Sequence, residues 1–394
     1  MSAPDPFAPA QLGPLTLRNR VIKSATFEGM TPKGLVTDNV IDYHRAVAEG
    51  GVGMTTLAYC AVSREGRGAP GEIVVRDEAI PGLRRFVDAM HEHGTAASMQ
   101  LGHAGPVAAN AGRRGLAPSR VFAPQALKFT LVASEDDLAG VIGAFAGAGR
   151  VASESGFDAV ELHFGHGYLI SAFLSPRLNK RRDQWGGTSE KRARLAREIA
   201  SAVRAAVDPR VAVVAKLNMT DGVKRGLDVD DSIEAARLLE SDGTVDAIEL
   251  TGGSSFQNPM FLFRGDAPIH EMAATFKPAM RLAFRLTSRK FMPAYPFEEA
   301  FFLPMARRFR AELRLPLILL GGITERATVE SAMAEGFEFV AIGRALLREP
   351  NLINRWRDGD ASESLCIHCN KCMPTIYTGT HCVLVPAGER PGLD

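Results

Sequence analysis

The chain lacks several features that would place it in other classes of protein. No stretch approaches the roughly 18 consecutive apolar residues of a membrane-spanning helix, and the start has no apolar core of a secretory signal. Its 46 basic and 45 acidic residues leave a net charge of +1, so the basic surplus of a nucleic-acid-binding protein is missing. We therefore expect a cytoplasmic protein that has neither a membrane nor a nucleic acid as its partner.

Two further absences narrow the class. Cysteine is scarce, with 5 in 394 residues, and four of the five follow residue 365, unlike the distribution in a secreted, disulfide-bonded framework. No GxGxxG sequence follows an early strand-like segment, which argues against a dinucleotide-binding Rossmann domain. Hydrophobic residues make up 46% of the chain and charged residues 23%, which is typical of a globular enzyme.

Short apolar segments recur along the chain. They are nearly continuous in hydrophobicity, as strands buried on both faces of a parallel sheet are, and they cover residues 20–26, 51–60, 95–102, 158–164, 211–218, 246–253, 315–322 and 339–346. Between them lie segments with helical spacing of apolar residues, at 79–94, 188–207, 231–243 and 324–336. The alternation predicts an α/β fold, a (β/α)8 TIM barrel with its active site at the carboxyl ends of the strands, and a doubly wound sheet is the alternative.

Two parts of the chain do not fit this repeat. Residues 254–314 are too many for one connection between the sixth and seventh strands, and they are rich in aromatic residues and proline. We interpret them as an inserted helical lid on the barrel rim, which is compatible with shaping a substrate pocket. The second part is the C-terminal tail, so we divide the chain into a barrel of residues 1–360 with this insertion and a cysteine-rich tail of residues 361–394.

Polar side chains gather where the predicted strands end, at Thr26, Gln100, His163, His166, Tyr168 and Lys216. In a barrel the carboxyl ends of all strands open into one mouth. The seventh and eighth strands end in Gly322 and Gly343, and Arg344 follows. Backbone N–H groups at such turns, together with a guanidinium, suit a phosphate group. A phosphorylated cofactor anchored at the last two strands follows from this position and chemistry.

Several motifs resemble those of the old yellow enzyme-like NADH:flavin oxidoreductases, a family that includes the N-terminal barrel domain of 2,4-dienoyl-CoA reductase. The resemblance covers residues 5–355 and rests on LGPLTLRNRVIKSAT near the start, MQLGHAG, HFGHGYLISAFLSPRLNKRRDQWGG, LLGGIT and AIGRALLREP. The third motif is the most specific, because an HxxHGYL turn joined to an FLSP helix and an NxRxDxxGG loop is hard to obtain by chance. The resemblance implies an FMN-binding barrel that uses NADH or NADPH as its reductant.

The resemblance also implies where FMN binds. It assigns the cofactor site to Thr26, Tyr59, Gln100, Lys216, Gly322, Gly343 and Arg344. Gln100 would bond the pyrimidine edge of the flavin, and Lys216 would lie near N1, where negative charge gathers in the reduced flavin. The last three residues match the phosphate site, and Tyr59 falls where family members often carry a small residue.

The resemblance further implies catalytic roles at the end of the fourth strand. His163 and His166 match a pair that donates hydrogen bonds to a substrate carbonyl oxygen, and Tyr168 matches the proton donor to the α-carbon. With a hydride from flavin N5 to the β-carbon, such a site reduces an activated, electrophilic alkene, as an ene-reductase does. Taken alone, the two histidines could be a metal pair, but no third ligand lies at a suitable spacing. A flavin-dependent amine dehydrogenase or demethylase, and a non-catalytic flavin- or metal-binding redox sensor, are the alternatives.

The tail carries four cysteines in the pattern C-x2-C-x2-C-x9-C, namely Cys366, Cys369, Cys372 and Cys382. In a cytosolic chain this pattern favours a metal or cluster site over disulfides. A related segment of the dienoyl-CoA reductase branch ligates a [4Fe–4S] cluster, but the spacing here is shorter, and no FAD- or NAD(P)-binding domain follows within the chain. An iron–sulfur cluster, a zinc ion and no metal stay open, as do the physiological alkene, the choice between NADH and NADPH, and a homo-oligomeric state.

Overall fold

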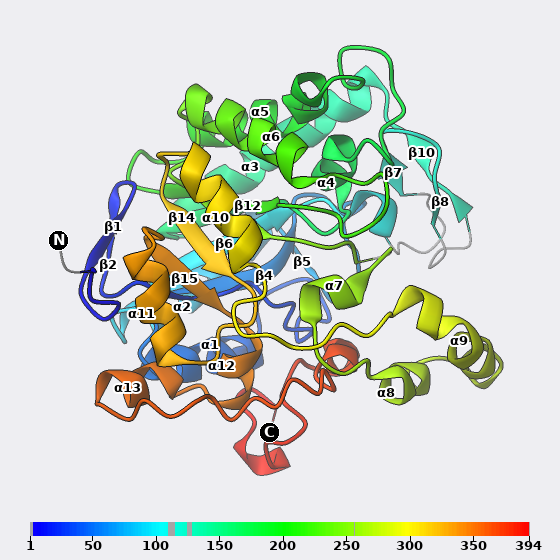
Figure 1. Ribbon diagram of the computed structural model, residues 1–394. Coiled ribbons are helices and arrows are strands. Elements are labelled where there is room, and N and C mark those ends of the chain that lie inside the picture. Colours follow the sequence, from blue (N-terminus) through cyan, green and yellow to red (C-terminus); the bar gives the residue numbers. More distant parts are fainter. Residues whose placement is uncertain (1–2, 109–114, 124–127, 256, 394) are drawn as a thin grey trace.

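The computed structural model describes residues 3–108, 115–123, 128–255 and 257–393. A closed barrel of parallel strands forms its centre (Figure 1). These strands are β3 (Val21–Lys23), β4 (Met54–Ala61), β6 (Ala96–Gly102), β11 (Ala159–Phe164), β12 (Ala212–Asn218), β13 (Ala247–Thr251), β14 (Leu317–Leu320) and β15 (Phe339–Ile342). Each overlaps one of the predicted apolar segments, and β3 closes the ring by pairing with both β15 and β4. The (β/α)8 barrel prediction is confirmed, and the doubly wound alternative is excluded.

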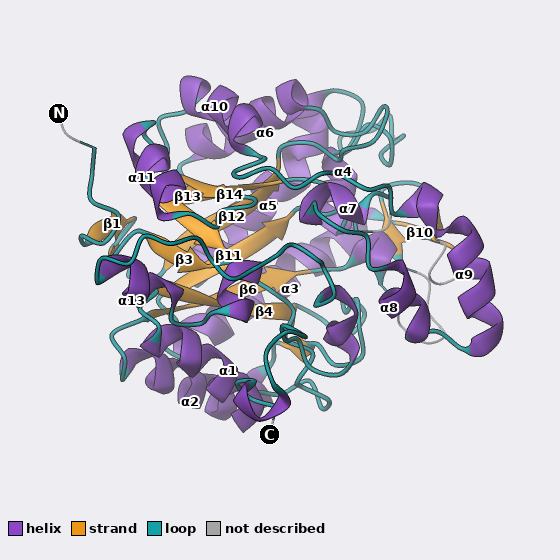
Figure 2. Cartoon of the chain, turned by 60° about the horizontal axis from the view of Figure 1, so that its bottom comes forward, coloured by secondary structure: helices purple, strands orange, loops and turns teal. Residues whose placement is uncertain are grey.

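Helices surround the strands (Figure 2). The outer layer contains α1 (Asp38–Glu49), α2 (Ile80–His91), α3 (Glu135–Glu154), α5 (Ser189–Ala206), α6 (Val229–Asp242), α10 (Leu303–Glu312), α11 (Arg326–Ala334), α12 (Arg344–Arg348) and α13 (Leu352–Arg357). Side-chain oxygens of Thr37, Ser134, Thr188 and Asp228 cap the first turns of α1, α3, α5 and α6. Gly243 then ends α6 in the left-handed conformation, with φ of 63°. Local chemistry therefore sets where these helices begin and end.

A short hairpin closes the amino-terminal end of the barrel. Its strands, β1 (Ala10–Leu12) and β2 (Leu15–Leu17), pair antiparallel. Leu12 and Leu17 are buried and pack in one cluster with Met54 and Phe339, which lie at the first residues of β4 and β15. Because this end is filled with side chains, the opposite end of the barrel is left to form the site.

The connections at the carboxyl ends of the strands are the longest. After β4 comes β5 (Ile73–Val74), and after β6 come β7 (Leu116–Ala117), β8 (Phe122–Ala123), β9 (Lys128–Phe129) and β10 (Leu131–Val132). The segment predicted as an insertion contains α7 (Pro259–Phe263), α8 (Ile269–Ala274) and α9 (Pro278–Phe291), and Figure 1 shows α8 and α9 projecting to one side of the barrel. Its last helix, α10, packs against α6 and β14. That end of the segment therefore lies in the ring of barrel helices.

The C-terminal tail lies against both the barrel and the inserted helices. It contains two short 3-10 helices, Met373–Tyr377 and Ala387–Glu389. The backbone N–H of Thr380 donates to the carbonyl of Glu28 in the loop after β3, at 2.7 Å. On the other side, the ring of His368 stacks on Phe297, with ring centroids 3.3 Å apart. Among the described residues, no helix combines the length and the apolar character needed to cross a bilayer.

Candidate active site

The turn that follows β11 places three proton-carrying side chains at the mouth of the barrel. Neighbouring strands hold this turn in place: the N–H of His166 donates to Asn218 Oδ1 at 3.0 Å, and the N–H of Leu169 donates to the carbonyl of His103 at 3.0 Å. His166 itself has φ of 61°, in the left-handed region. A tight turn before α4 (Leu169–Leu174) therefore aims His163, His166 and Tyr168 into one space.

The two histidines are linked in series. His163 Nδ1 accepts the N–H of Gly165 at 3.2 Å, so its proton is on Nε2. That Nε2 lies 3.1 Å from Nδ1 of His166, and Nε2 of His166 lies 2.9 Å from the hydroxyl of Thr251. Each imidazole is thus neutral and donates one N–H, the first to the second ring and the second to Thr251. The structure brings the predicted pair together, with its donors bonded within the chain.

Burial keeps these groups in their neutral forms. Desolvation, followed by the charge of Lys216, lowers the pKa of His163 to about 3. Desolvation, followed by the charges of His163 and Lys216, also lowers the pKa of His166. For Tyr168, desolvation and then the carboxyl of Glu72 raise the pKa of the phenol. Near neutral pH the site therefore holds two uncharged hydrogen-bond donors and one protonated phenol.

Tyr168 stacks directly on the first histidine. Its ring centroid lies 4.6 Å from that of His163, at an interplanar angle of 6°. Tyr59, predicted to line the flavin, meets both rings edge-on, with centroids 5.9 Å from His163 and 5.4 Å from Tyr168. Its hydroxyl is buried without a hydrogen-bond partner among the described residues. The structure therefore brings Tyr59 into contact with the catalytic candidates.

A buried ionic network lies below this site, inside the barrel. Lys216 Nζ lies 2.5 Å from Glu249 Oε1, 3.6 Å from Glu161 Oε1 and 3.0 Å from Ser24 Oγ. Burial opposes the ammonium charge, but the two carboxylates outweigh it and raise the pKa of Lys216. Desolvation and then Glu249 raise the pKa of Glu161 to about 8. Lys216 therefore stays charged and pairs with Glu249, while burial and Glu249 shift Glu161 toward its protonated form.

Gln100 joins the same network. Its Nε2 donates to Glu161 Oε1 at 2.6 Å. A primary amide has a second N–H and a carbonyl oxygen, so Gln100 can also bond a ligand at the mouth. The structure thus connects two predicted flavin residues, Gln100 and Lys216, through the carboxyl of Glu161.

The predicted phosphate turn is formed by the ends of β14 and β15. The strand register sets Leu320 opposite Ala341, so Gly322 and Gly343 end up side by side. Among the described residues, no backbone carbonyl accepts the N–H of Gly322 or of Gly343. Thr26, predicted to lie near the flavin, is also at this edge, since its hydroxyl is 4.0 Å from where a Cβ on Gly343 would stand. Free N–H groups at a strand–helix turn suit the phosphate of FMN.

The inserted segment packs on the same turn. A Cβ on Gly322 would stand 2.6 Å from the ring of Phe301, and a Cβ on Gly321 would stand 2.5 Å from the ring of Phe302. The N–H of Ala300 donates to the carbonyl of Gly322 at 2.8 Å. Glycine is therefore required here both for its positive φ, 74° at Gly322, and for the close approach of two aromatic rings.

Arg344 points toward the tail. Its guanidinium donates to the carbonyl of Arg264 at 3.0 Å and to the side chain of Asn370. Burial lowers the pKa of Arg344, and the cysteines Cys366, Cys372 and Cys369 partly oppose this shift. The predicted phosphate ligand thus lies next to Gly343, with its guanidinium bonded between the inserted segment and the cysteine-rich tail.

The four tail cysteines are free thiols that line one small cavity, together with Arg344. The cavity has a volume of about 20 Å³, which is enough for about one water molecule. Desolvation raises the pKa of Cys372 to about 12. In the described part of the chain, no three His, Cys, Asp or Glu side chains are arranged to hold a metal ion. The thiols converge, therefore, but not at metal-ligand geometry.

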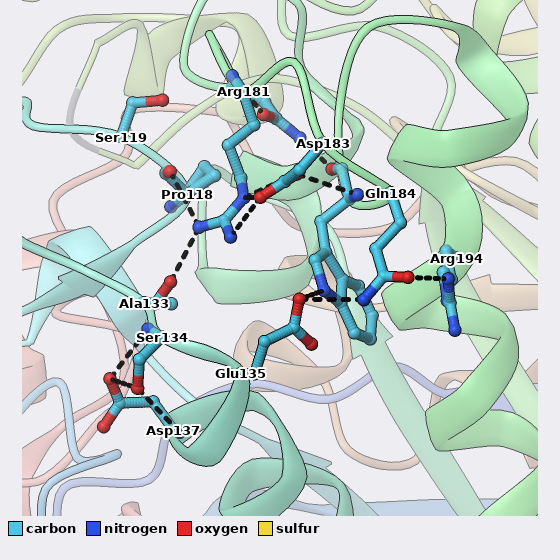
Figure 3. Close-up of polar contacts among 12 residues, drawn as sticks. Pro118, Ser119, Ala133, Ser134, Glu135, Asp137, Arg181, Asp183, Gln184 and Arg194 are labelled. Atoms are coloured by element: carbon cyan, nitrogen blue, oxygen red, sulfur yellow. Dashed lines mark hydrogen bonds and ion pairs between the residues drawn. The ribbon is translucent and has the colours of Figure 1, made fainter.

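The NxRxDxxGG loop after α4 is a scaffold rather than part of the site (Figure 3). Arg181 donates to the carbonyl of Ala133 at 2.7 Å and to Asp183 at 2.7 Å. Gln184 Nε2 and the indole N–H of Trp185 both donate to Glu135 Oε1 at 2.8 Å. These bonds tie the loop to the first turn of α3 and so fix the position of α4 behind the catalytic turn.

Several residues of the site were not predicted from the sequence. They are Glu72, Glu161, Asn218, Glu249 and Thr251, which contact or surround the predicted residues. A signal for two of them is present in the sequence, because Glu161 and Glu249 interrupt the apolar strands DAVELHF and DAIELTGG. A charged residue is almost never fully buried unless it has a partner. Two such residues in strands on either side of a third therefore indicate a buried cation between them.

The chain is similar in sequence to several known proteins. The sequence pattern of the NADH:flavin oxidoreductase / NADH oxidase family matches residues 5–252. The chain is 52% identical over 387 residues to the 4,4'-dithiodibutanoate disulfide reductase of Rhodococcus erythropolis, covering 97% of this chain and 96% of the relative. It is 30% identical over 376 residues to a metal reductase of Desulforamulus reducens, covering 94% of this chain but 52% of that longer protein.

Solved structures share the fold. The 2-naphthoyl-CoA reductase complex superposes with a TM-score of 0.81 at 24% identity, covering 97% of this chain and 57% of that protein. Morphinone reductase superposes with a TM-score of 0.70 at 21% identity, covering 93% of this chain and 94% of that protein. With the family pattern, the full-length relative and the barrel site together, the chain belongs to the NADH:flavin oxidoreductase / NADH oxidase family, the old yellow enzyme-like flavoproteins.

Proposed function

We propose that the protein is an FMN-dependent NAD(P)H oxidoreductase that reduces an activated C=C bond at the His163–His166–Tyr168 site. The stacking of Tyr168 on a neutral His163 carries this proposal, because it puts an acid and a hydrogen-bond donor within one substrate length. The free N–H groups at Gly322 and Gly343 and the buried ammonium of Lys216 fit a phosphorylated flavin. FMN, once reduced by NADH or NADPH, would supply the hydride.

The chain's own residues orient and polarise the substrate. A carbonyl oxygen that enters the site competes with His166 and Thr251 for the imidazole N–H groups, so the histidines exchange bonds within the chain for bonds to the substrate. Two such donors stabilise the negative charge that develops on the oxygen. Tyr168 carries its proton on the phenol oxygen and delivers it to the α-carbon. Together these groups reduce an alkene conjugated to a carbonyl.

A second candidate, reduction of an organic disulfide, is favoured by the relative from Rhodococcus erythropolis, which is 52% identical over 97% of this chain. A hydride from reduced FMN and a proton from Tyr168 would suffice for this reaction too. A hydride adds two electrons and one hydrogen to one sulfur, the S–S bond breaks, and the second sulfur leaves as a thiolate that takes the proton of Tyr168. Two thiols result, with no change in what the histidines and the phenol must do.

The two substrate classes can be separated in one experiment. Enzyme reduced anaerobically with NADH is mixed with cyclohexenone or with 4,4'-dithiodibutanoate, and re-oxidation is followed by the flavin absorbance. We expect cyclohexenone to re-oxidise the flavin. Re-oxidation by the disulfide alone would replace the first proposal by the second. Reduction of the oxidised enzyme by an amine, with neither acceptor active, would favour the amine dehydrogenase alternative. Full flavin loading without NAD(P)H turnover would favour the non-catalytic one.

We also propose that Cys366, Cys369, Cys372 and Cys382 bind a metal centre. Their convergence on one cavity beside Arg344 supports this. The present volume of about 20 Å³ suits a single ion such as zinc better than a [4Fe–4S] cluster, which would have to push the loops apart. Iron, acid-labile sulfide and zinc are measured in protein purified without oxygen. We expect one metal in stoichiometric amount, and finding none at that level would remove both metal proposals.

We place the protein in the cytoplasm, because a reducing compartment keeps cysteines as the free thiols that all five are in the structure. Its partner there is a small electrophilic molecule rather than a nucleic acid or a membrane. We also propose that the chain forms a homo-oligomer. Gel filtration with light scattering measures the oligomeric state.

A further inference from the structure

The loop between β4 and β5 carries a buried carboxyl group that the reaction described above does not use. Glu72 is 3% exposed. Its Oε2 accepts the backbone N–H of Gly68 at 2.6 Å, which folds the loop back toward the mouth of the barrel. The loop also touches the strand that leads to the site, since the N–H of Ala104 donates to the carbonyl of Gly66 at 2.7 Å. Glu72 therefore has a fixed position above the catalytic turn.

Gly68 connects this carboxyl group with Tyr168. A Cβ at position 68 would stand 3.1 Å from Glu72 Oε1 and 3.7 Å from the hydroxyl oxygen of Tyr168. One point in space is thus close to both oxygens. Because glycine has no side chain, no atom of residue 68 beyond its Cα hydrogens stands between the acid and the phenol, and Ala104 Cβ is the other near neighbour, 3.4 Å from the same point. No direct hydrogen bond joins the two oxygens among the described residues, so a proton would pass between them through one bridging water.

The reaction creates a need for such a group. After Tyr168 has given its proton to the substrate, a phenolate remains in a buried place, and burial followed by the nearby carboxyl of Glu72 raises the pKa of this phenol. Desolvation raises the pKa of Glu72 to about 8, although the N–H groups of Gly68 and Ala69 and the charge of Arg67 oppose the shift. Glu72 is thus protonated at neutral pH and is a stronger acid than the phenol. Proton transfer from the carboxyl to the phenolate runs downhill.

The other ionisable groups facing Glu72 do not compete as donors. Desolvation and then the carboxyl of Glu72 raise the pKa of Tyr59. For Cys60, desolvation and then Glu28 and Glu72 raise the pKa of the thiol. Both groups hold their protons more tightly than the carboxyl does. Glu72 is therefore the strongest acid next to Tyr168 among the described residues.

We propose that Glu72 returns the proton to Tyr168 after each turnover, across the open space at Gly68. Tyr168 O–H gives its proton to the substrate, the carboxyl O–H of Glu72 gives its proton to the phenolate oxygen, and the Glu72 carboxylate takes a proton from water at the mouth. No electrons move in these steps. The inference rests on the proposed function, since it takes Tyr168 as the proton donor.

The test separates the first turnover from those that follow. Glu72→Gln keeps an oxygen for the N–H of Gly68 but has no acidic proton. We expect the first re-oxidation of reduced enzyme by cyclohexenone to stay near the wild-type rate, because Tyr168 starts protonated. Steady-state turnover falls by about 10²-fold. Gly68→Ala, whose new methyl group fills the gap, shows the same split. Glu78→Gln changes neither rate, because Glu78 is an exposed carboxylate that lies after β5, outside this loop.

The pH profile gives an independent readout. Wild-type steady-state turnover decreases as pH rises through about 8, where Glu72 loses its proton, and Glu72→Gln lacks this decrease. Wild-type steady-state rates in both the Glu72→Gln and Gly68→Ala variants would overturn the inference, as would equal losses in the first and later turnovers. Failure of the proposed function looks different, because Tyr168→Phe would then leave the first turnover unchanged.

Discussion

Tyr168→Phe is expected to slow re-oxidation of the reduced enzyme by cyclohexenone by about 10²–10⁴-fold, the range for the loss of a general acid. Phenylalanine keeps the ring that stacks on His163 at 4.6 Å, so the site keeps its shape and loses only the proton. Reduction of the flavin by NADH needs no proton from this phenol and should stay near the wild-type rate. Stopped-flow absorbance measures the two half-reactions separately.

A matched control and a contradicting outcome are available for this variant. Tyr377 is an exposed phenol on the tail, with 57% of its surface accessible, and Tyr377→Phe should change neither half-reaction. Equal slowing of both half-reactions by Tyr168→Phe would show that the hydroxyl supports the shape of the site rather than proton transfer. The assignment of the proton donor would then be withdrawn, together with the role of Glu72.

Lys216→Met is expected to destabilise the folded protein by about 3–5 kcal/mol, the typical cost of leaving buried charge without its partner. The ammonium lies between Glu161 and Glu249, and all three side chains are 3% exposed or less. Methionine has a similar length but leaves two carboxyl groups facing each other. The measurement is the midpoint of thermal unfolding of variant and wild type, both loaded with FMN.

The pH dependence of this variant follows from the carboxyl groups. In the wild type the pKa of Glu161 is already raised to about 8, by burial first and then by Glu249. Loss of the ammonium raises it further above its value in the unfolded chain, which is about 4.5. The variant is therefore most stable below that pH, and its deficit relative to the wild type grows as pH rises through and beyond 8. Lys216→Arg should restore most of the loss, and Lys191→Met, on the exposed face of α5, should cost little. A deficit that does not vary with pH would contradict the role given to the carboxyl groups.

Much of the barrel could be predicted because its strands are buried on both faces. A parallel sheet covered by helices is the arrangement that best buries eight nearly continuous apolar runs, and all eight became strands. The hairpin of Ala10–Leu12 and Leu15–Leu17 could not be predicted in this way, since strands of three residues carry no usable period. The boundary between the inserted segment and the barrel helix α10 could not be predicted either, because nothing in the composition separates α10 from the helices before it.

The residues of the site also differ in how far the sequence could predict them. His163, His166 and Tyr168 lie close together in the chain, so one motif identifies all three. Glu72 comes from a loop and Thr251 from the end of β13, both distant in sequence, and they meet the site only through the closure of the barrel. The serial bonding of the two imidazoles was also out of reach, since it depends on the left-handed conformation of His166 rather than on residue identity. The direction of Arg344 depends likewise on Asn370 of the tail.

The packing of Phe301 and Phe302 on the Gly321–Gly322 turn has a practical consequence for redesign. Exchanging this aromatic stretch to admit bulkier acceptors would also change the floor on which, in the proposed site, the riboflavin phosphate rests. Breadth of acceptor choice and retention of the prosthetic group would then be traded against each other in this scaffold. Libraries of variants in this stretch are best screened first for the yellow colour of bound flavin and only then for turnover.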